Sequence, residues 1–368
     1  MRVLICAGGT GGGIYPALAA VTALTEKGVT KDQILWIGTE GEMEEVLVPR
    51  AGLRLQTISG GGIAGVPIHQ KILNALKLVW SLPKSWGIIR RFKPDVMFMT
   101  GGYMAAPVTV ASRLSGTPIC IYLPDLEPGK SIRFSVPFAK RIAATVDGSK
   151  QFVPEEKMVV TGYPVRPLLR QALSATKEEA LAKFELKPDR LTLFVYGGSR
   201  GSWNINKALM AILPQLLEKI QIIHLSGTLT WPEVEANIAN LSADEKKYYR
   251  AYPFLHEEMG LAYRASDWVL ARAGASMLGE SPAFGLPSIL VPLTFAWRYQ
   301  KVNADYLSAR GAAEQLTDET LDEKLLPMLL AFIEDAEKRQ KMHLAAKEID
   351  IPDAANRLAD AILETAKG

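Results

Sequence analysis

Residues 3–13 are Val-Leu-Ile-Cys-Ala-Gly-Gly-Thr-Gly-Gly-Gly, a short apolar run that leads directly into glycines. Such a run is typical of a strand that is buried on both faces of a parallel sheet. The pattern returns at residues 193–202, Leu-Phe-Val-Tyr-Gly-Gly-Ser-Arg-Gly-Ser. An echo about half a chain away indicates two similar units. Because glycines let backbone N–H groups approach an anion at a helix start, each run predicts a phosphate-binding loop.

Strands and helices alternate along the rest of the chain, which predicts doubly wound α/β sheets. The expected strands are residues 2–7, 34–38, 95–100, 119–123 and 158–161, then 191–196, 221–225, 251–255, 268–271 and 288–292. After the last of these strands we expect only helices. The 368 residues exceed what one core usually serves, so we expect two Rossmann-like domains, residues 1–165 and 166–368. Prolines mark residues 163–190 as their connection, and the last helix can cross back to the first domain.

The two cysteines and the chain start bear on the cellular compartment. Cys6 and Cys120 both lie in apolar runs, so we expect buried thiols and a reducing environment rather than a disulfide. No signal peptide and no membrane-spanning apolar run is recognisable. The sequence therefore predicts a cytoplasmic protein.

The net charge is only +3, but the first half carries most of the basic residues. Between Glu45 and Asp95 there is no acidic residue, and basic and apolar residues alternate there: Arg50, Arg54, Lys71, Lys77, Lys84, Arg90, Arg91 and Lys93, with Ile72, Leu73, Leu76, Val79, Trp80, Leu82 and Trp86. This composition is typical of a peripheral surface that contacts anionic lipid at the inner face of the membrane. The alternative is an amphipathic helix with a solvated basic face. Nucleic acid is not expected as a partner, because no binding motif accompanies the patch.

The first glycine loop disfavours two common nucleotide sites, that of nicotinamide enzymes and the Walker type. It does not match the dinucleotide pattern, and the acid nearest the second strand, Glu40, lies in a run of glutamates that we expect to be solvated. No Walker lysine follows either. A third glycine element, Gly101-Gly102-Tyr103, comes after another expected strand. Ligands gather at the carboxyl ends of such strands, so this element is a candidate for the same site.

The second half carries a polar segment, residues 272–280, that is suited to a nucleotide. Ala275 and Ser276 would supply N–H groups at a helix start, and the Glu280 carboxylate could accept two ribose hydroxyls. The alternative is a capped helix with one solvated glutamate. Further on, Gln300 and Asn303 share a helix face and could contact sugar hydroxyls.

Taken in order, these motifs resemble the MurG family of peptidoglycan glycosyltransferases, in glycosyltransferase family 28, over nearly the whole chain. The matching positions are Gly8 to Gly12 with Tyr15-Pro16-Ala17-Leu18, Gly101-Gly102-Tyr103, Gly162, Pro164-Val165-Arg166, Gly197-Gly198-Ser199 with Gly201, Phe254-Leu255 with Met259, Gly274-Ala275 to Glu280, and Gln300 with Asn303. The resemblance implies the GT-B fold, two Rossmann-like domains facing a cleft. It also implies inverting transfer of N-acetylglucosamine from UDP-GlcNAc to lipid I, a lipid-linked acceptor, giving lipid II.

Carried over by position, the family pattern implies roles for residues of both domains. Thr10, Gly11 and Gly12 would lie near the acceptor diphosphate and the donor sugar, with Gly102 and Tyr103 beside them. Ser199 and Arg166 would meet the donor phosphates. Leu255, after Phe254, would contact the uracil, Glu280 the ribose, and Gln300 with Asn303 the sugar. The remaining substrate-binding positions are Ala275, Ser276, Met277, Leu278 and Gly279. N–H groups and arginine would stabilise the leaving UDP, with no tightly held metal or other cofactor.

The chain departs from the family pattern at the expected catalytic position. The first glycine loop of the family ends in a histidine, a favoured base, and here this position is Gly13. A carboxylate, Asp125, follows the strand at residues 119–123 and could replace the base or order the acceptor. Capping of the next turn is the alternative for Asp125. Met277 replaces a threonine, and residues 296–299, Ala-Trp-Arg-Tyr, replace the usual polar residues before Gln300.

Three hypotheses remain open on the sequence alone. The first is an N-acetylglucosaminyltransferase of the MurG type, which the intact nucleotide motifs favour. The second is a related GT-B transferase with a different sugar or acceptor. The third is a nucleotide-sugar-binding descendant without turnover. The loss of the histidine and the altered residues on the sugar side favour the second and the third. A UDP-sugar epimerase is disfavoured by the order of the motifs.

Overall fold

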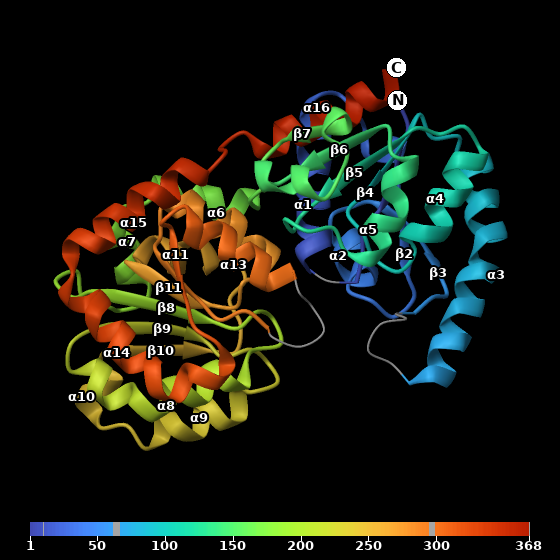
Figure 1. The fold of residues 1–368 in the computed structure, drawn as a ribbon. Coiled ribbons are helices and arrows are strands. Elements are labelled where there is room, and N and C mark those ends of the chain that lie inside the picture. Colours follow the sequence, from blue (N-terminus) through green and yellow to red (C-terminus); the bar gives the residue numbers. More distant parts are fainter. Residues whose placement is uncertain (10, 62–66, 294–298, 368) are drawn as a thin grey trace. The chain divides into compact units, whose positions relative to one another are not determined.

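The computed structural model describes residues 1–9, 11–61, 67–293 and 299–367. The chain forms two compact units, Met1–Arg166 with Ile351–Gly368, and Pro167–Asp350 (Figure 1). It leaves the first unit once and returns to it through the last helix, α16 (Ala354–Lys367). Each unit contains one parallel sheet with helices on both faces.

The first unit is built on seven strands in the order β3-β2-β1-β4-β5-β6-β7, all parallel. These are β1 (Val3–Cys6), β2 (Ile34–Thr39), β3 (Arg54–Ile58), β4 (Val96–Met99), β5 (Ile119–Leu123), β6 (Arg141–Ala144) and β7 (Met158–Val160). Val3 and Ile5 belong to one buried cluster, and Leu4 and Cys6 belong to the cluster on the opposite face. Because successive side chains alternate between two buried faces, every position of β1 is apolar.

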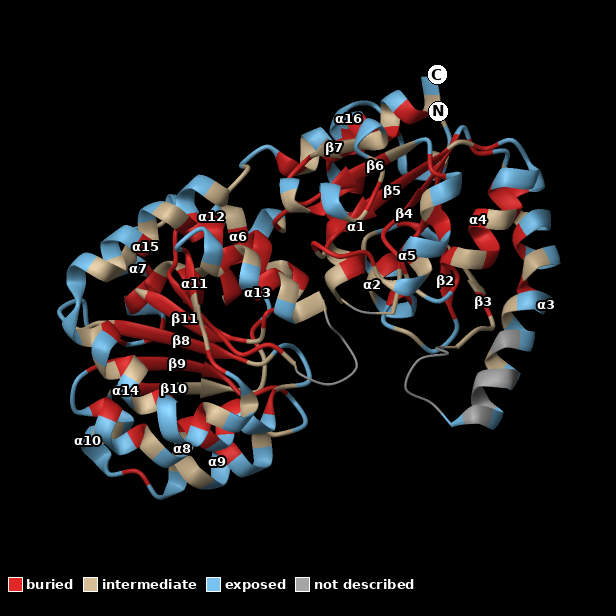
Figure 2. Cartoon of the chain, in the orientation of Figure 1, coloured by how far each residue is buried: buried red, intermediate tan, exposed pale blue. Residues whose placement is uncertain are grey.

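Helices cover both faces of this sheet. The cluster that contains Val3 includes residues of α1 (Gly11–Glu26) and α16, and the cluster that contains Leu4 includes residues of α3 (Ile68–Phe92) and α4 (Ala105–Leu114). The other α-helices of this unit are α2 (Glu44–Arg50) and α5 (Lys130–Ser135). Figure 2 shows the buried strands between helices whose outer faces are exposed.

The second unit has six parallel strands in the order β10-β9-β8-β11-β12-β13. These are β8 (Thr192–Tyr196), β9 (Gln221–Leu225), β10 (Tyr249–Tyr252), β11 (Trp268–Ala271), β12 (Ser288–Leu290) and β13 (Ala313–Gln315). The helices are α6 (Pro167–Gln171), α7 (Lys177–Lys183), α8 (Trp203–Leu217), α9 (Trp231–Ala239), α10 (Ala243–Lys246), α11 (Met259–Ala265), α12 (Glu280–Phe284), α13 (Tyr299–Ala309), α14 (Leu321–Glu334) and α15 (Ala336–Ile349).

The predicted fold class is confirmed, but three strands were missed. β3 and β13 are edge strands with polar, partly exposed residues, and β6 is only four residues long. The expectation of helices alone after residue 292 was therefore wrong at β13. The strand expected at 251–255 lies earlier, at β10. Residues 167–190, expected as a connection, belong to the second unit, where α6 and α7 pack against α11.

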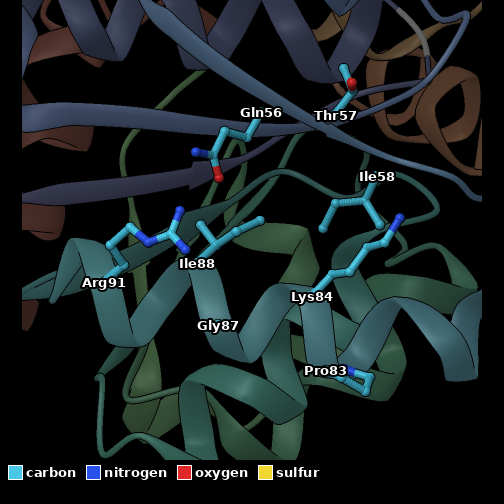
Figure 3. Close-up of a pocket in the computed structure, with 8 residues that line it drawn as sticks. All are labelled: Gln56, Thr57, Ile58, Pro83, Lys84, Gly87, Ile88 and Arg91. Atoms are coloured by element: carbon cyan, nitrogen blue, oxygen red, sulfur yellow. The ribbon is translucent and has the colours of Figure 1, made fainter.

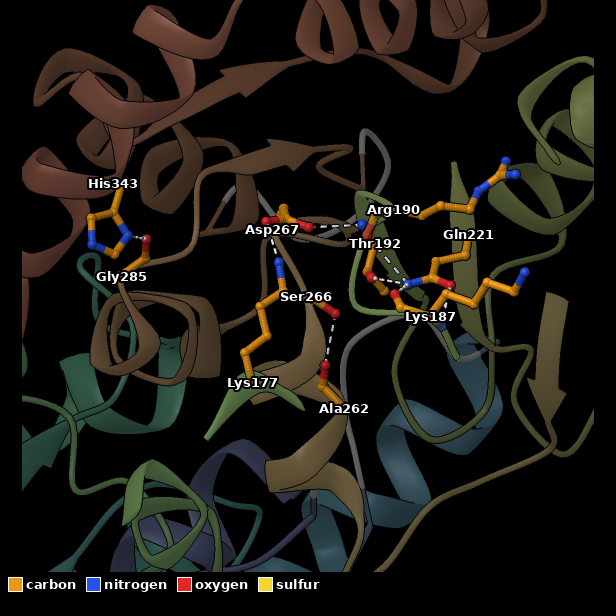
Figure 4. Close-up of polar contacts among 10 residues, drawn as sticks. All are labelled: Lys177, Lys187, Arg190, Thr192, Gln221, Ala262, Ser266, Asp267, Gly285 and His343. Carbon is orange, nitrogen blue, oxygen red and sulfur yellow. Dashed lines mark hydrogen bonds and ion pairs between the residues drawn. The ribbon is translucent and has the colours of Figure 1, made fainter. Parts of the chain in front are cut away.

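The amino-terminal ends of the strands of the second unit are joined by side chains (Figure 4). The Asp267 carboxylate accepts the Thr192 N–H at 2.7 Å and contacts Lys177 Nζ at 2.5 Å. The Gln221 amide accepts the Lys187 N–H at 2.9 Å and donates to the Lys187 carbonyl at 2.7 Å. These polar groups form hydrogen bonds and an ion pair with one another. The amino-terminal ends of the strands therefore stabilise the fold and do not form a ligand site.

Both cysteines are free and buried, as expected from their apolar runs. Burial raises the pKa of the Cys120 thiol to about 12, and burial together with the Glu44 charge raises the pKa of Cys6. Since the thiolate is the reactive form, neither side chain is suited to nucleophilic chemistry.

Candidate active site

The strand order places a ligand site in each unit. In the first sheet the order reverses between β1 and β4, and in the second it reverses between β8 and β11. Helices leave in opposite directions at such a point, so a crevice opens at the carboxyl ends of the two strands. All four strands are followed by a glycine-containing segment: residues 8–13, 101–102, 197–201 and 274. The glycines therefore lie where a doubly wound sheet binds its ligand.

In the first unit, the glycine elements after β1 and β4 are in direct contact. A Cβ atom added to Gly102 would lie 3.1 Å from the Gly8 carbonyl oxygen, and Gly102 has a positive φ of 98°. Thr100 donates from Oγ1 to the Gly13 carbonyl at 2.9 Å, which ties β4 to the start of α1. Only residues without a side chain allow this approach.

A buried carboxylate packs against the first glycine loop and accepts a hydrogen bond from it. Glu44 is 0% exposed and accepts the N–H groups of Thr39 at 2.9 Å and Gly9 at 3.3 Å. A Cβ on Gly8 would lie 2.2 Å from Glu44 Oε1, so the carboxylate packs directly against the loop. The expectation that the glutamate run is solvated is therefore wrong for Glu44. The run has no apolar periodicity that would have revealed this burial.

The other predicted residues of the first unit lie close to this loop or on the same edge of the sheet. Gly11 and Gly12 open α1, where backbone N–H groups lack intrahelical partners, and Tyr103 approaches Gly9. The Arg166 guanidinium lies over the Tyr15 ring of α1, 4.7 Å from its centre. Thr10 lies outside the described residues.

Asp125 lies two residues after β5, which is the neighbour of β4. Its side chain is partly exposed. Burial is the main cause of the raised pKa of the Tyr122 phenol, and the negative charge of Asp125 raises that pKa further. The nearby Glu127 is buried and forms an ion pair with Arg133 at 2.8 Å. Asp125 thus lies just beyond the carboxyl end of β5, the strand next to β4.

The four histidines belong to other segments of the chain than the first glycine loop. His224 is buried in β9 and His343 contacts the Gly285 carbonyl at 2.6 Å, while His69 and His256 are exposed (Figure 4 shows His343). Gly13 itself is buried, and an added Cβ would lie 3.0 Å from Thr100 Oγ1. A side chain at Gly13 therefore requires a small shift of Thr100.

A pocket of about 430 Å³ opens at the switch point of the second sheet. It is lined by Tyr196, Gly197, Gly198, Gly201, Ser202, Trp203, Asn204, Arg272, Gly274, Ser276, Leu293, Gln300 and Asp318. Its glycine wall precedes α8, a helix of 15 residues, so the positive end of the helix dipole faces this wall. A pocket of this kind is suited to a phosphorylated ligand.

The glycine wall of this pocket is closely packed. Gly198 and Gly201 have positive φ angles of 91° and 86°. A Cβ on Gly227, in the loop after β9, would lie 2.1 Å from the Gly201 Cα atom. Ser199 is exposed at the turn of the loop, where its carbonyl accepts the Thr228 N–H at 3.4 Å. Ser199 is beside the pocket but does not line it.

The segment after β11 forms a short 3-10 turn, Ala275–Leu278. Its first bond runs from the Met277 N–H to the Gly274 carbonyl at 2.9 Å, so the N–H groups of Ala275 and Ser276 come before any intrahelical bond. Ser276 lines the pocket and Ala275 is buried beside it. Met277 is also buried, and its sulfur accepts a hydrogen bond from the Tyr196 hydroxyl.

Glu280 begins α12 after Leu278 and Gly279, and it is almost fully buried. Its Oε2 accepts the Tyr263 hydroxyl at 3.1 Å, and the hydroxyls of Tyr263 and Tyr196 are 2.6 Å apart. Tyr196 lines the pocket, so this chain of hydroxyls connects Glu280 to it. The alternative of a solvated glutamate at this position is therefore wrong.

Gln300 and Asn303 lie one turn apart in α13 but differ in their surroundings. Gln300 lines the pocket, and its Oε1 accepts the Leu293 N–H at 3.0 Å. Asn303 is fully buried and donates to the Ala273 carbonyl at 3.1 Å, so it holds the segment before Gly274. Phe254 and Leu255 follow the edge strand β10 and do not line the pocket.

An ion pair that we did not predict forms part of the pocket wall. Arg272 and Asp318 are 46 residues apart in the chain, yet their side chains meet at 2.8 Å with only about a tenth of each exposed. Arg272 also donates to the Val291 carbonyl at 3.1 Å. Trp203, another unpredicted lining residue, is half exposed at the first position of α8. Its position directly after the second glycine loop could have identified it.

In the ranges 1–9, 11–61, 67–293 and 299–367, no three His, Cys, Asp or Glu side chains are grouped so that they could hold a metal ion. Within the same ranges, every helix is too short or too polar to cross a bilayer.

The model of the glycosyltransferase family 28 N-terminal domain matches residues 3–144, and that of the family 28 C-terminal domain matches residues 192–358. The chain belongs to glycosyltransferase family 28. The two family domains correspond to the two glycine loops and the two sheets, so the predicted family is confirmed.

Relatives in the family match the chain over its whole length. A protein of Halothermothrix orenii is 35% identical over 380 residues, with all of both chains covered, and one of Desulforamulus reducens is 35% identical with 96% of each covered. Both are named UDP-N-acetylglucosamine--N-acetylmuramyl-(pentapeptide) pyrophosphoryl-undecaprenol N-acetylglucosamine transferase. A crystal structure of MurG from Acinetobacter baumannii is 25% identical, covers 99% of both chains and has a TM-score of 0.78. The GT-B architecture is therefore that of family 28.

Proposed function

We propose that this chain transfers N-acetylglucosamine from UDP-GlcNAc to the N-acetylmuramyl sugar of lipid I, giving lipid II. The observation that carries the proposal is the full-length match, at 35% identity, to relatives named for this transfer. The glycine loops at the switch points of both parallel sheets support the proposal, because a transfer needs one site for the donor and one for the acceptor.

The pocket of the second unit is the proposed donor site. Backbone N–H groups around Gly198 and at Ala275 and Ser276 would bind the diphosphate, together with the dipole of α8. Glu280 would accept ribose hydroxyls, and Gln300 would contact the sugar. Hydrogen-bond donors at the diphosphate stabilise the charge that develops on the leaving UDP.

The glycine loop of the first unit is the proposed acceptor site, with Asp125 as the base. The acceptor hydroxyl would attack the anomeric carbon while the bond from that carbon to the UDP oxygen breaks, with inversion. The proton of the hydroxyl would pass to the Asp125 carboxylate. Two observations support Asp125 as the base. It follows the carboxyl end of β5, and Gly13, at the position where the family has a histidine, has no side chain that could accept a proton.

We also propose that helix α3 associates with the anionic inner face of the membrane, where the lipid-linked acceptor resides. Apolar side chains along α3 are exposed, with Trp80 77% exposed and Val79 68%. Basic residues lie among them, and Arg90 stacks on the Trp86 ring at 4.8 Å. An exposed apolar surface with basic residues at its margin is suited to anionic lipid. We expect the protein to sediment with vesicles that contain phosphatidylglycerol, and we expect added salt to weaken this binding.

A transfer assay with radiolabelled UDP-GlcNAc and a lipid I analogue tests the reaction. We expect turnover in the wild type, a loss of about 100-fold or more in Asp125→Ala, and near-normal turnover in Glu156→Ala, an exposed carboxylate of the same unit. UDP binding without any turnover in the wild type would overturn the proposal in favour of a different substrate or a non-catalytic descendant.

The same assay is applied to Gly13→His. Gly13→Ala is its control, because it shows the effect of adding a Cβ atom at this buried position without adding a base. If Asp125 is the base, neither substitution raises turnover. A gain in Gly13→His alone would show that the base is missing from the wild-type chain, which would contradict the role of Asp125.

A further inference from the structure

The first unit contains a second pocket, away from the glycine loops, between strand β3 and helix α3. It has a volume of about 390 Å³, and its lining includes Gln56 of the strand and Lys84, Gly87 and Arg91 of the helix (Figure 3). Its volume lies within the range of small-molecule sites. The strand supplies one wall and one face of the helix supplies the other.

The polar groups of this pocket are suited to an anion. Figure 3 shows Lys84, Arg91 and the Gln56 amide directed into the space between strand and helix. Neither Lys84 nor Arg91 has a carboxylate partner among the residues that the structure describes. The chain has no acidic residue from position 46 to position 94, so β3 and α3 carry no internal neutralising charge. Two unneutralised cations and an amide donor favour a phosphate group.

Gly87 keeps the helix wall of the pocket open. It lies in the interior of α3, where glycine lowers helix stability relative to alanine. A Cβ atom at Gly87 would meet no heavy atom within 4 Å, so close packing does not require a glycine there. The lack of a side chain instead leaves room for an occupant of the pocket.

The exposed apolar part of α3 continues the same helix face. Trp80, Lys84, Gly87 and Arg91 are spaced by four, three and four residues, which places them in one stripe. Leu73 and Leu76 extend the stripe toward the start of the helix, and each is 53% exposed. A ligand that fits this face has a phosphate for the pocket and apolar chains for the region beside Trp80.

We propose that the pocket between β3 and α3 binds the phosphate of an anionic glycerophospholipid headgroup, with the apolar stripe of α3 against the acyl region. This inference deepens the proposed membrane association of α3 and rests on it. Non-specific adsorption depends only on net charge, whereas a headgroup pocket depends on which cations are present. The two can therefore be separated by variants of equal charge.

Calorimetry with dihexanoylphosphatidylglycerol below its micelle concentration tests the pocket without a bilayer. We expect Lys84→Gln with Arg91→Gln to weaken binding at least about tenfold, because two charge-assisted hydrogen bonds are lost. The control, Lys77→Gln with Arg90→Gln, removes the same charge from exposed positions of α3 outside the pocket and should change binding less than about twofold. Gly87→Leu, which fills the pocket at constant charge, should weaken binding as the first pair does. Equal effects of both pairs, or no binding in the wild type, would overturn the pocket.

Two further measurements are needed. One distinguishes a lipid headgroup from free phosphate as the occupant of the pocket, and the other tests membrane association of α3 separately from the pocket. Inorganic phosphate should displace the lipid only weakly; displacement as strong as that by the lipid itself would overturn a lipid headgroup as the occupant. Sedimentation of the wild type with phosphatidylglycerol vesicles tests membrane association by itself. If vesicle binding occurs but falls equally in both charge pairs, membrane association stands and the pocket fails. If the wild type does not bind vesicles even at low salt, the proposed membrane association fails as well.

Discussion

Buried carboxylates lie beside the glycine segments of both units. Glu44 accepts backbone N–H groups beneath the first loop, and Glu280 accepts the Tyr263 hydroxyl behind the pocket of the second unit. A buried carboxylate is costly unless hydrogen bonds compensate for lost hydration. Each of these side chains has such bonds, and for Glu280 the proposed ribose contact would add to them.

The residue Glu280 gives a direct test of the proposed donor site. Glu280→Ala should weaken UDP binding by roughly tenfold to a hundredfold, because a hydrogen bond to a charged group contributes about 1.5–3 kcal/mol. Isothermal titration calorimetry with UDP measures the change.

Two control variants separate ribose binding from local packing. Glu280→Gln keeps one acceptor and should lose less affinity than Glu280→Ala. Tyr263→Phe removes the internal hydrogen bond to Glu280 but keeps the carboxylate, so UDP affinity should fall only slightly. Equal UDP affinity in Glu280→Ala and the wild type would contradict the ribose contact.

At the scale of elements, a buried polar network joins β9 to α8 and β10. His224 in β9 is fully buried, with the Tyr249 hydroxyl at 2.6 Å from Nδ1 and Asn206 Oδ1 at 3.0 Å from Nε2. The Asn206 amide donates to the Ser226 carbonyl at 2.8 Å, in the loop that contacts the second glycine loop. Strand and helix are thereby held next to the proposed diphosphate site.

This network predicts a pH dependence of stability. Burial lowers the pKa of His224 to about 3, while an unfolded histidine has a pKa of about 6.5. The unfolded state therefore binds a proton first as the pH falls. The contribution of His224 to the free energy of unfolding should be fully present above pH 6.5. Below that pH, this contribution should decrease by about 1.4 kcal/mol per pH unit.

Urea unfolding from pH 7 to pH 5, compared between the wild type and His224→Gln, measures this contribution. The glutamine amide can retain hydrogen bonds but does not titrate. We expect a shallower loss of stability with falling pH in the variant, even if it is less stable at pH 7. Parallel slopes in the two proteins would rule out His224 as the titrating group.

At the scale of the whole molecule, the last helix makes the first unit discontinuous in sequence. Leu358, Ala359 and Ile362 of α16 belong to the same buried cluster as Val3 and Ile14. Lys27, directly after α1, forms an ion pair at 2.8 Å with Asp360 of α16, and α16 also contacts β4, β5 and β6. The core of the first unit thus includes both ends of the chain.

A core substitution in α16 should therefore destabilise the amino-terminal unit. Leu358→Ala should cost about 2–5 kcal/mol, since it opens a cavity at a fully buried position. Hydrogen-exchange mass spectrometry should show faster exchange in α1 and β4 and unchanged exchange in β8 and α8. Leu344→Ala, at a position of α15 that is 53% exposed, is the matched control and should have little effect. Faster exchange confined to the second unit would contradict this assignment.

Much of the fold could be predicted because the responsible signals are local. An apolar run before glycines indicates a buried strand and a tight loop wherever it occurs, and β1 and β8 confirm this. The edge strands β3 and β13 lacked that signal, because only one side of an edge strand has a neighbour and polar residues are tolerated there. For the same reason, the β3 wall of the neighbouring pocket had no sequence signal, whereas Lys84 and Arg91 of its α3 wall belong to the basic stretch that the sequence did reveal.

By itself the sequence determined the fold class, the family and the segments that carry the two glycine loops. Each glycine loop depends on a few consecutive residues, and the fold class and family depend on the order in which such local signals follow one another along the chain. Only the tertiary structure decided that Glu44 is buried beneath one loop, that Asn303 holds the backbone at Ala273, and that Arg272 meets Asp318 in the pocket wall. It also decided that α16 completes the first core. These features depend on which distant residues approach one another, and burial and hydrogen bonding arise only from that approach.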